Sequence, residues 1–182
     1  MSASQQKFSR KLIGRTGERG SSLIEVMIAS VVMLIGILPL VGVFSVAVAT
    51  NAGQVDIGTR TALNAQDKME QLMALSFTDA ASNTAVYPTA AAGGTGIGGV
   101  MGGSATVGGV NPAAPVASYV DYITSQGVLQ TTVTGAKYRR QWSISTDASG
   151  NLKTITVFVT VVSWAGPGLA PSTTLVCMKS NN

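Results

Sequence analysis

The pattern of hydrophobic and polar positions changes along the chain, and each part of it predicts a different element. The stretch 26–55 carries no charged residue, and a helix needs only about 20 apolar residues to cross the hydrocarbon core of a membrane. Over 51–78, apolar residues recur at spacings near 3.6, which is typical of an amphipathic helix. We therefore expect one long helix from about residue 22 to residue 77, with a membrane-spanning half at 21–50 and an amphipathic half at 51–78.

The charged residues of the amphipathic half are expected to form a solvated helix face. They are Asp56, Arg60, Asp67, Lys68 and Glu70. Asp56 and Arg60 are four residues apart, a spacing that predicts an exposed ion pair on the helix surface. No pairing of these side chains suggests catalysis.

In the last third of the chain, 119–182, the period changes from 3.6 to 2, which predicts strands. Tyr138, Trp142 and Ile144 fall on one face of the first long strand, and a turn signal at 147–151 separates it from the second. The expected strands are 128–133, 137–146, 152–163 and 173–178. Because a sheet with one apolar face needs a cover, we predict an α+β fold in which the long N-terminal helix packs on a small antiparallel β-sheet.

The segment 79–118 is built mainly of small residues and glycine, and it is expected to form a flexible surface loop that links helix to sheet. Gly94–Gly99 match the glycine spacing of a dinucleotide-binding loop. That interpretation needs a preceding strand and a following helix, and the sequence predicts neither.

Composition and charge narrow the function classes. The chain has no His, and Cys177 is its only Cys, so the commonest general base and metal ligand is missing and an internal disulfide is excluded. Residues 1–20 account for the whole formal net charge of +4, so the rest of the chain has no overall attraction for nucleic acid. We expect no enzyme activity, no cofactor, no metal and no small-molecule substrate.

Two further residue patterns have a plain structural interpretation. Tyr138 and Trp142 stand beside basic residues, a mixture that can bind single-stranded nucleic acid, but the alternation places both rings on the core face. Cys177 lies between apolar residues of a predicted strand and is expected to be a small buried side chain.

The residues around position 20 carry a resemblance to a known family. The sequence there runs Gly17-Glu18-Arg19-Gly20, then Ser21-Ser22-Leu23-Ile24-Glu25-Val26-Met27-Ile28-Ala29. It resembles the cleavage region of type IV prepilins and of the pseudopilins of type II secretion, although many members have Phe where this chain has Ser21. The predicted sheet region 119–182, which we call the head, has a strand, a tight turn and a second strand, and it also looks like the sheet of minor pilins of the PilV type.

The resemblance implies a processing pathway and a set of partners. Residues 1–20 would be a basic leader, and a prepilin peptidase would cut between Gly20 and Ser21 and methylate the new amine of Ser21. Glu25, the fifth residue after the cut, would face that amine on a neighbouring subunit and set the register of assembly. The implied partners are other pilins through packing of the N-terminal helices, the peptidase and the inner-membrane assembly platform.

The membrane segment has two features of its own. Basic residues concentrated before it place its N-terminal side in the cytoplasm, which predicts a single-pass inner-membrane protein before assembly into an extracellular pilus. Pro39 lacks an N–H group and is expected to kink or locally unwind the helix.

Two alternatives to a minor type IV pilin stay open at this point. A pseudopilin of a type II secretion system would share every N-terminal feature. Ala47-Val48-Ala49 also matches a signal-peptidase site, and a cut after Ala49 would release an exported β domain that begins at Thr50.

Overall fold

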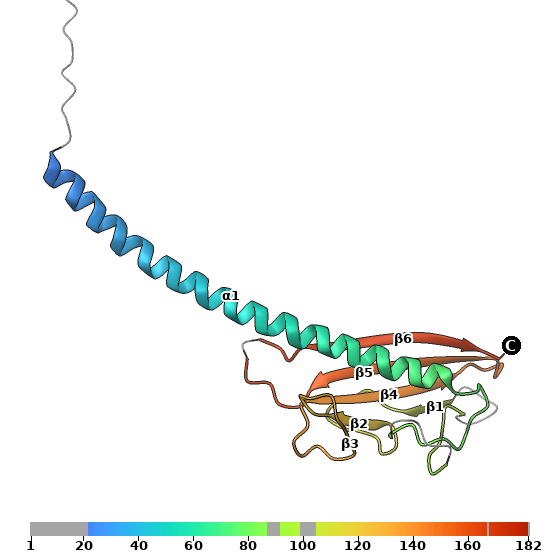
Figure 1. Cartoon of the computed structure of the whole chain (residues 1–182). Coiled ribbons are helices and arrows are strands. Elements are labelled where there is room, and N and C mark those ends of the chain that lie inside the picture. The colour runs from blue at the N-terminus through green and yellow to red at the C-terminus, as the bar shows by residue number, and fades with distance from the viewer. Residues whose placement is uncertain (1–21, 87–91, 99–104, 167, 182) are drawn as a thin grey trace, which may run out of the picture. The chain divides into compact units, whose positions relative to one another are not determined.

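The computed structural model describes residues 22–86, 92–98, 105–166 and 168–181. These residues form one helix and six strands (Figure 1). The elements are α1 (Leu23–Ala74), β1 (Ala105–Gly108), β2 (Val120–Ile123), β3 (Leu129–Gln130), β4 (Tyr138–Thr146), β5 (Leu152–Val161) and β6 (Ser172–Ser180). The chain divides after Val46 into two compact units, so α1 begins in the first unit and ends in the second.

The helix α1 begins and ends close to the predicted residues. Ser22 stands at the N-cap position, and its carbonyl accepts hydrogen bonds from the backbone N–H groups of Glu25 and Val26. The helix continues through Pro39 without interruption. The predicted unwinding is therefore absent, and whether Pro39 kinks the helix stays a prediction.

The C-terminal end of α1 is completed by lysines from the sheet. No basic residue lies in the last turn of the helix. Instead, the ammonium group of Lys179 on β6 donates to the carbonyl of Met73 at 2.7 Å and to that of Leu75, while Lys153 on β5 donates to the carbonyl of Phe77. Lys179 therefore pairs carbonyls at the end of the helix, where its dipole favours positive charge, whereas the carbonyl bound by Lys153 lies in the chain just after the helix.

The sheet is antiparallel throughout, with the order β3-β2-β4-β5-β6, and β1 pairs with β4 beyond the end of β2. One long ladder joins β4 and β5, from Tyr138 opposite Val161 to Thr146 opposite Lys153, and another joins β5 and β6. A turn at 147–151 connects the two strands, and Gly150 adopts a φ of 73° there, which glycine tolerates without strain. The structure confirms the predicted strands 137–146, 152–163 and 173–178 within a few residues. The predicted strand 128–133 is reduced to β3.

The core lies between the sheet and the part of α1 that belongs to the second unit. Its fully buried side chains come from α1, the Gly-rich segment, β4 and β5, and they are Ala65, Leu72, Ile97, Trp142, Ile144, Ile155, Val157 and Val159. The α+β class, with a long helix on a small antiparallel sheet, is therefore confirmed. Tyr138 and Trp142 are 3% and 0% exposed, so both rings lie in the core as the alternation predicts.

The described part of 79–118 differs from the expected surface loop. β1 pairs with β4 there, and Ile97 is completely buried in the core. The N–H groups of Gly94 and Gly96 donate to the carbonyls of Ala81 and Ser82, which ties the segment to the chain just after α1. The expectation of a loop was wrong for β1, and the expectation of a surface position was wrong for Ile97, because a single large apolar side chain among small ones is enough to fix part of such a segment in a core.

Candidate functional site

The processing residues predicted from the sequence lie at the edge of the described structure. The leader 1–20, Gly20 and Ser21 are outside the described residues. Glu25 lies in the first turn of α1, where the helix dipole favours a carboxylate. Pro39 lies farther along the same helix, so the structure places Glu25 and Pro39 on one element.

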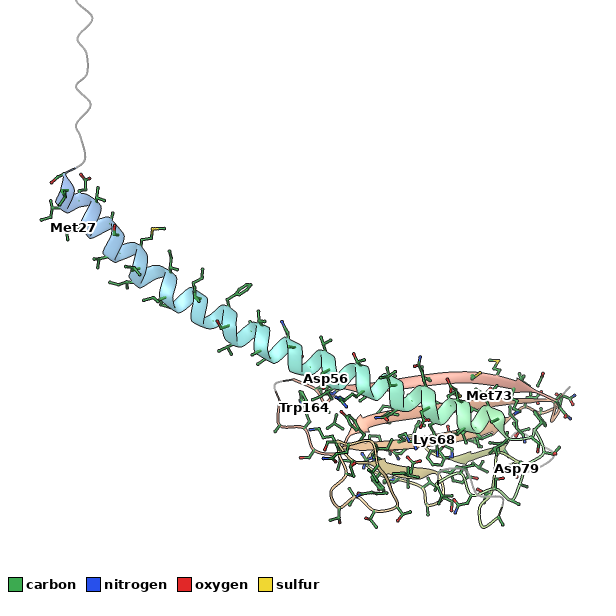
Figure 2. The ribbon with its side chains drawn as sticks, in the orientation of Figure 1. Met27, Asp56, Lys68, Met73, Asp79 and Trp164 are labelled. Carbon is green, nitrogen blue, oxygen red and sulfur yellow. The ribbon has the colours of Figure 1, made fainter. Side chains whose placement is uncertain are left out.

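The part of α1 in the first unit presents apolar side chains to its surroundings along its whole length. From Leu23 to Val46 the large apolar side chains are 43–79% exposed. Figure 2 shows side chains projecting from both edges of this part of the helix as viewed, with Met27 labelled among them. The helix is long and apolar enough to cross a membrane. An exposed apolar surface of this size calls for lipid or for other apolar helices around it.

Two serine hydroxyls in this segment are satisfied within the helix. The hydroxyl of Ser30 donates to the carbonyl of Val26 at 2.7 Å, and the hydroxyl of Ser45 donates to the carbonyl of Val41 at 2.8 Å. Such local bonds hide hydroxyl donors from an apolar environment. The two serines therefore add little cost to burial of the helix in lipid or among other helices.

A buried charge cluster, made of Asp67, Lys68, Asp121 and Arg140, joins α1 to the sheet. Asp121 on β2 accepts from the ammonium of Lys68 at 2.8 Å, and from Nε and Nη2 of Arg140 at 2.7 and 2.9 Å. Arg140 on β4 also donates through Nη1 to Asp67 at 2.7 Å. The side chains of Lys68, Asp121 and Arg140 are at most 2% exposed, whereas that of Asp67 is 54% exposed.

Lys68 has two further partners. Its ammonium donates to the carbonyl of Thr84 and lies 4.0 Å from the centre of the Trp142 ring, a cation–π contact. Figure 2 labels Lys68 on the side of α1 that faces the strands. Lys68 therefore interacts with Asp121 on β2, with the segment that follows α1 and with the ring of Trp142 in the core.

The cluster is electrically balanced, with two cations and two carboxylates. Burial lowers the pKa of Lys68, and the charge of Asp121 opposes that effect. Burial also acts to lower the pKa of Arg140, but its hydrogen bonds and charge interaction with Asp121 outweigh burial, so this pKa is raised. Such an arrangement fixes the position of α1 on the sheet, because a shift of the helix would leave buried charges without partners.

The position of Lys68 corrects a prediction from the sequence. We expected Lys68 on a solvated helix face, yet it is fully buried. The exposed pair of Asp56 and Arg60 is confirmed, with 3.1 Å between the Arg60 Nε and an Asp56 oxygen. The strand alternation places Arg140 on the same face as Tyr138 and Trp142. This alternation is the feature of the sequence that indicates a charged side chain between the sheet and the helix.

A shallow depression of about 370 Å³ lies beside the cluster, between α1 and the turn that joins β2 to β3. It is lined by Asn64, Asp67, Ile123, Gly127, Leu129 and Arg140. The guanidinium of Arg140 is already held by two carboxylates, so it is not available to attract an anionic ligand. Within the described ranges, no group of three or more His, Cys, Asp or Glu side chains could hold a metal ion.

In comparisons with known proteins, no family model matches the chain, and no curated protein or solved structure matches it. The resemblance to prepilins therefore depends on residues 17–29 and on the apolar helix that follows them. The exposed apolar part of α1 and the buried charge cluster are the two features on which a functional proposal can be built.

Proposed function

We propose that this chain is a minor type IV pilin, a structural subunit that is cut after Gly20 and assembled into a filament through its N-terminal helix. The observation that carries the proposal is the exposed apolar part of α1, whose acidic residue Glu25 lies in the first turn. Lipid covers this surface before assembly, and the helices of neighbouring subunits cover it afterwards. The work of the protein is packing, and it performs no chemistry of its own.

The proposed pathway gives Glu25 a specific role. Cleavage by a prepilin peptidase on the cytoplasmic side leaves a free amine on Ser21, which the enzyme then methylates. The carboxylate of Glu25 pairs with the amine of an adjacent subunit, because each charge is costly in an apolar bundle when alone and tolerable when paired. The pair sets the register of neighbouring helices, and the inner-membrane assembly platform moves the subunit into the filament.

The head contributes by holding its own end of the helix. The buried charge cluster fixes α1 to β2 and β4, and Lys179 and Lys153 bind the carbonyls at and just after the helix end. With these contacts, the part of α1 in the second unit stays attached to the sheet when the subunit is moved. This supports a function in which the helix is the assembly element and the sheet is the exposed body.

The variant Glu25→Ala tests the role of the first turn, with Glu70→Ala as a matched control, because Glu70 is an exposed acid on the same helix. We expect both variants to be cut after Gly20 at the normal rate. Only Glu25→Ala should be lost from filaments that are sheared off the cells and blotted for this subunit. Recovery of Glu25→Ala at the wild-type level would contradict the proposed register pair.

A second candidate has one observation in its favour. The chain divides into compact units after Val46, close to the site after Ala49 at which a signal peptidase would release an exported β domain. In that case the released protein begins at Thr50 and has no apolar helix to assemble. A type II secretion pseudopilin would keep the helix and would be recovered with the secretion apparatus in place of the pilus.

A further inference from the structure

Three connections of the sheet lie at the end of the second unit where α1 enters it. Their described residues are 124–128 between β2 and β3, 131–137 between β3 and β4, and 162–166 and 168–171 between β5 and β6. The strand residues that border them, Ile123, Tyr138 and Val161, are paired across the sheet, so the three connections share one end of it. Figure 1 shows them where the arrowhead of β5 lies, which is also where α1 reaches the sheet. We call these connections the entry end.

Contacts inside the second unit place the entry end beside α1. The hydroxyl of Thr61 lies 2.9 Å from that of Thr173 at the start of β6, and Arg60 lines a depression of about 130 Å³ together with the turn between β2 and β3. The uncharged stretch of α1 ends at Val55, which is about 9 Å along the helix from Thr61. Residues 47–55 belong to the second unit. The boundary between uncharged and charged positions on the helix therefore lies inside this unit, close to the entry end.

Each connection of the entry end exposes one large apolar side chain. Val128, Val133 and Leu169 are 58%, 50% and 95% exposed. Trp164 is half-buried in the same connection as Leu169, and its ring lies against Gly166. Exposed apolar side chains that gather in this way mark a surface for a protein partner or for a membrane, and tryptophan is enriched at the level of lipid headgroups.

The charges at this end favour a membrane as the partner. From residue 122 to residue 182 the only acidic residue is Asp147, which lies in the turn at the opposite end of the sheet. Lys137 brings a positive charge to the entry end, and the carboxylate of Asp56 on α1 is bonded to Arg60. The entry end is therefore net positive and complementary to anionic lipid. The entry end of a second copy would carry the same charge and would repel it.

We propose that the entry end docks on the anionic lipid surface of the membrane that α1 crosses. Leu169, Val128 and Val133 insert among the headgroups, and the ammonium of Lys137 lies against the phosphates. Docking gives the unassembled subunit a defined orientation on the membrane. This inference rests on one step of the proposed function, the placement of α1 in lipid before assembly.

The test places a fluorophore on the full chain in lipid nanodiscs that each hold a single copy. The lipid is an equal mixture of phosphatidylglycerol and phosphatidylcholine. The fluorophore is the dye NBD, whose fluorescence lifetime is longer in lipid than in water. It is attached to Leu169→Cys in a Cys177→Ser background. The matched control is Ala148→Cys in the same background, because Ala148 is exposed in the turn at the opposite end of the sheet.

We expect a long-lifetime fraction for the label at position 169 and only the short lifetime at position 148. Lys137→Gln should lower the ratio of docked to undocked chains about fivefold, because one basic residue near an anionic surface contributes a factor of about this size. Nanodiscs of phosphatidylcholine alone should lower the ratio in the same direction. Equal lifetime distributions at positions 169 and 148, or a ratio that Lys137→Gln leaves unchanged, would overturn the proposal.

A third label separates this proposal from the proposed function. It is attached to Val32→Cys, in the apolar part of α1. If the label at position 32 lies in lipid and the label at position 169 lies in water, docking is overturned and the pilin proposal stays in place. If the label at position 32 lies in water, both are overturned. A long lifetime at position 169 that appears only in nanodiscs with several copies would identify a second copy as the occupant and would overturn docking on lipid.

Discussion

Asp121 is the carboxylate on which the attachment of α1 to the sheet depends most. It is completely buried and bonds to both buried cations, Lys68 and Arg140. The substitution Asp121→Asn keeps the shape of the side chain but leaves two buried cations with only the half-exposed Asp67 to balance them. Breaking a buried ion pair in this way costs about 3–5 kcal/mol. Since a domain is stable by about 5–15 kcal/mol, the head should lose a large part of its free energy of unfolding.

Urea unfolding of the full chain in micelles measures this loss. Tryptophan fluorescence reports in part on the site, because Lys68 lies on the ring of Trp142, which is one of the two tryptophans of the chain. The matched control is Asp56→Asn, which removes a carboxylate from an ion pair whose side chains are 52% and 63% exposed. Exposed pairs contribute up to about 1 kcal/mol, so the control should shift the unfolding midpoint only slightly. If Asp121→Asn costs no more than Asp56→Asn, the cluster does not hold the helix, and this account of the attachment is wrong.

Three other predictions use the same unfolding assay. The substitution Gly108→Ala should destabilise by about 3 kcal/mol, because φ is 75° there and a Cβ would overlap the carbonyl oxygen of Trp142. Gly127→Ala should cost only about 1 kcal/mol: its φ of 84° is unfavourable for alanine, but no atom lies within 4 Å of the added carbon. Equal losses for the two glycines would refute the steric argument. Lys179→Met should cost about 2 kcal/mol, because it leaves carbonyls at the end of α1 without a partner. The control variant Lys137→Met should cost less than about 0.5 kcal/mol. Similar losses for the two variants would show that Lys179 does not stabilise the end of the helix.

The regular parts of the fold could be predicted because their signals are local. The alternation in β4 and β5 extends over most of each strand, with exceptions at Gln141 and Thr160, and the turn between them contains the residues that such turns require. The long apolar stretch predicts a helix, because strands are rarely this long. Each of these signals can be recognised without knowing what the element packs against.

The buried charge cluster could not be predicted in the same way. Lys68 and Asp121 are 53 positions apart, and nothing local indicates that they meet. Hydrophobic periodicity predicts a surface position for a lysine, although its charge can be buried when a carboxylate and a guanidinium are buried with it. β2 was missed for a related reason, since its inward position is occupied by Asp121 and breaks the apolar alternation.

The Gly-rich segment shows a third limit. Its composition predicts a loop, and small residues do dominate it. Yet Ile97 is fully buried, and β1 adds a short strand to β4. Composition averages over a segment, whereas packing depends on single side chains. The processing site is the opposite case, because only the sequence gives information on it. Gly20 and Ser21 were identified from the sequence and lie outside the described residues.

The N-terminus of the mature protein tests the proposed function most directly. It can be determined by mass spectrometry on filaments sheared from cells with and without the prepilin peptidase. With the peptidase present, we predict that the filament-borne chain begins at Ser21 with a methylated amine. Without the peptidase, we predict that the chain extracted from the cells retains residues 1–20 and that none is found in filaments. A mature chain that begins at Thr50 and is absent from filaments would contradict the proposal.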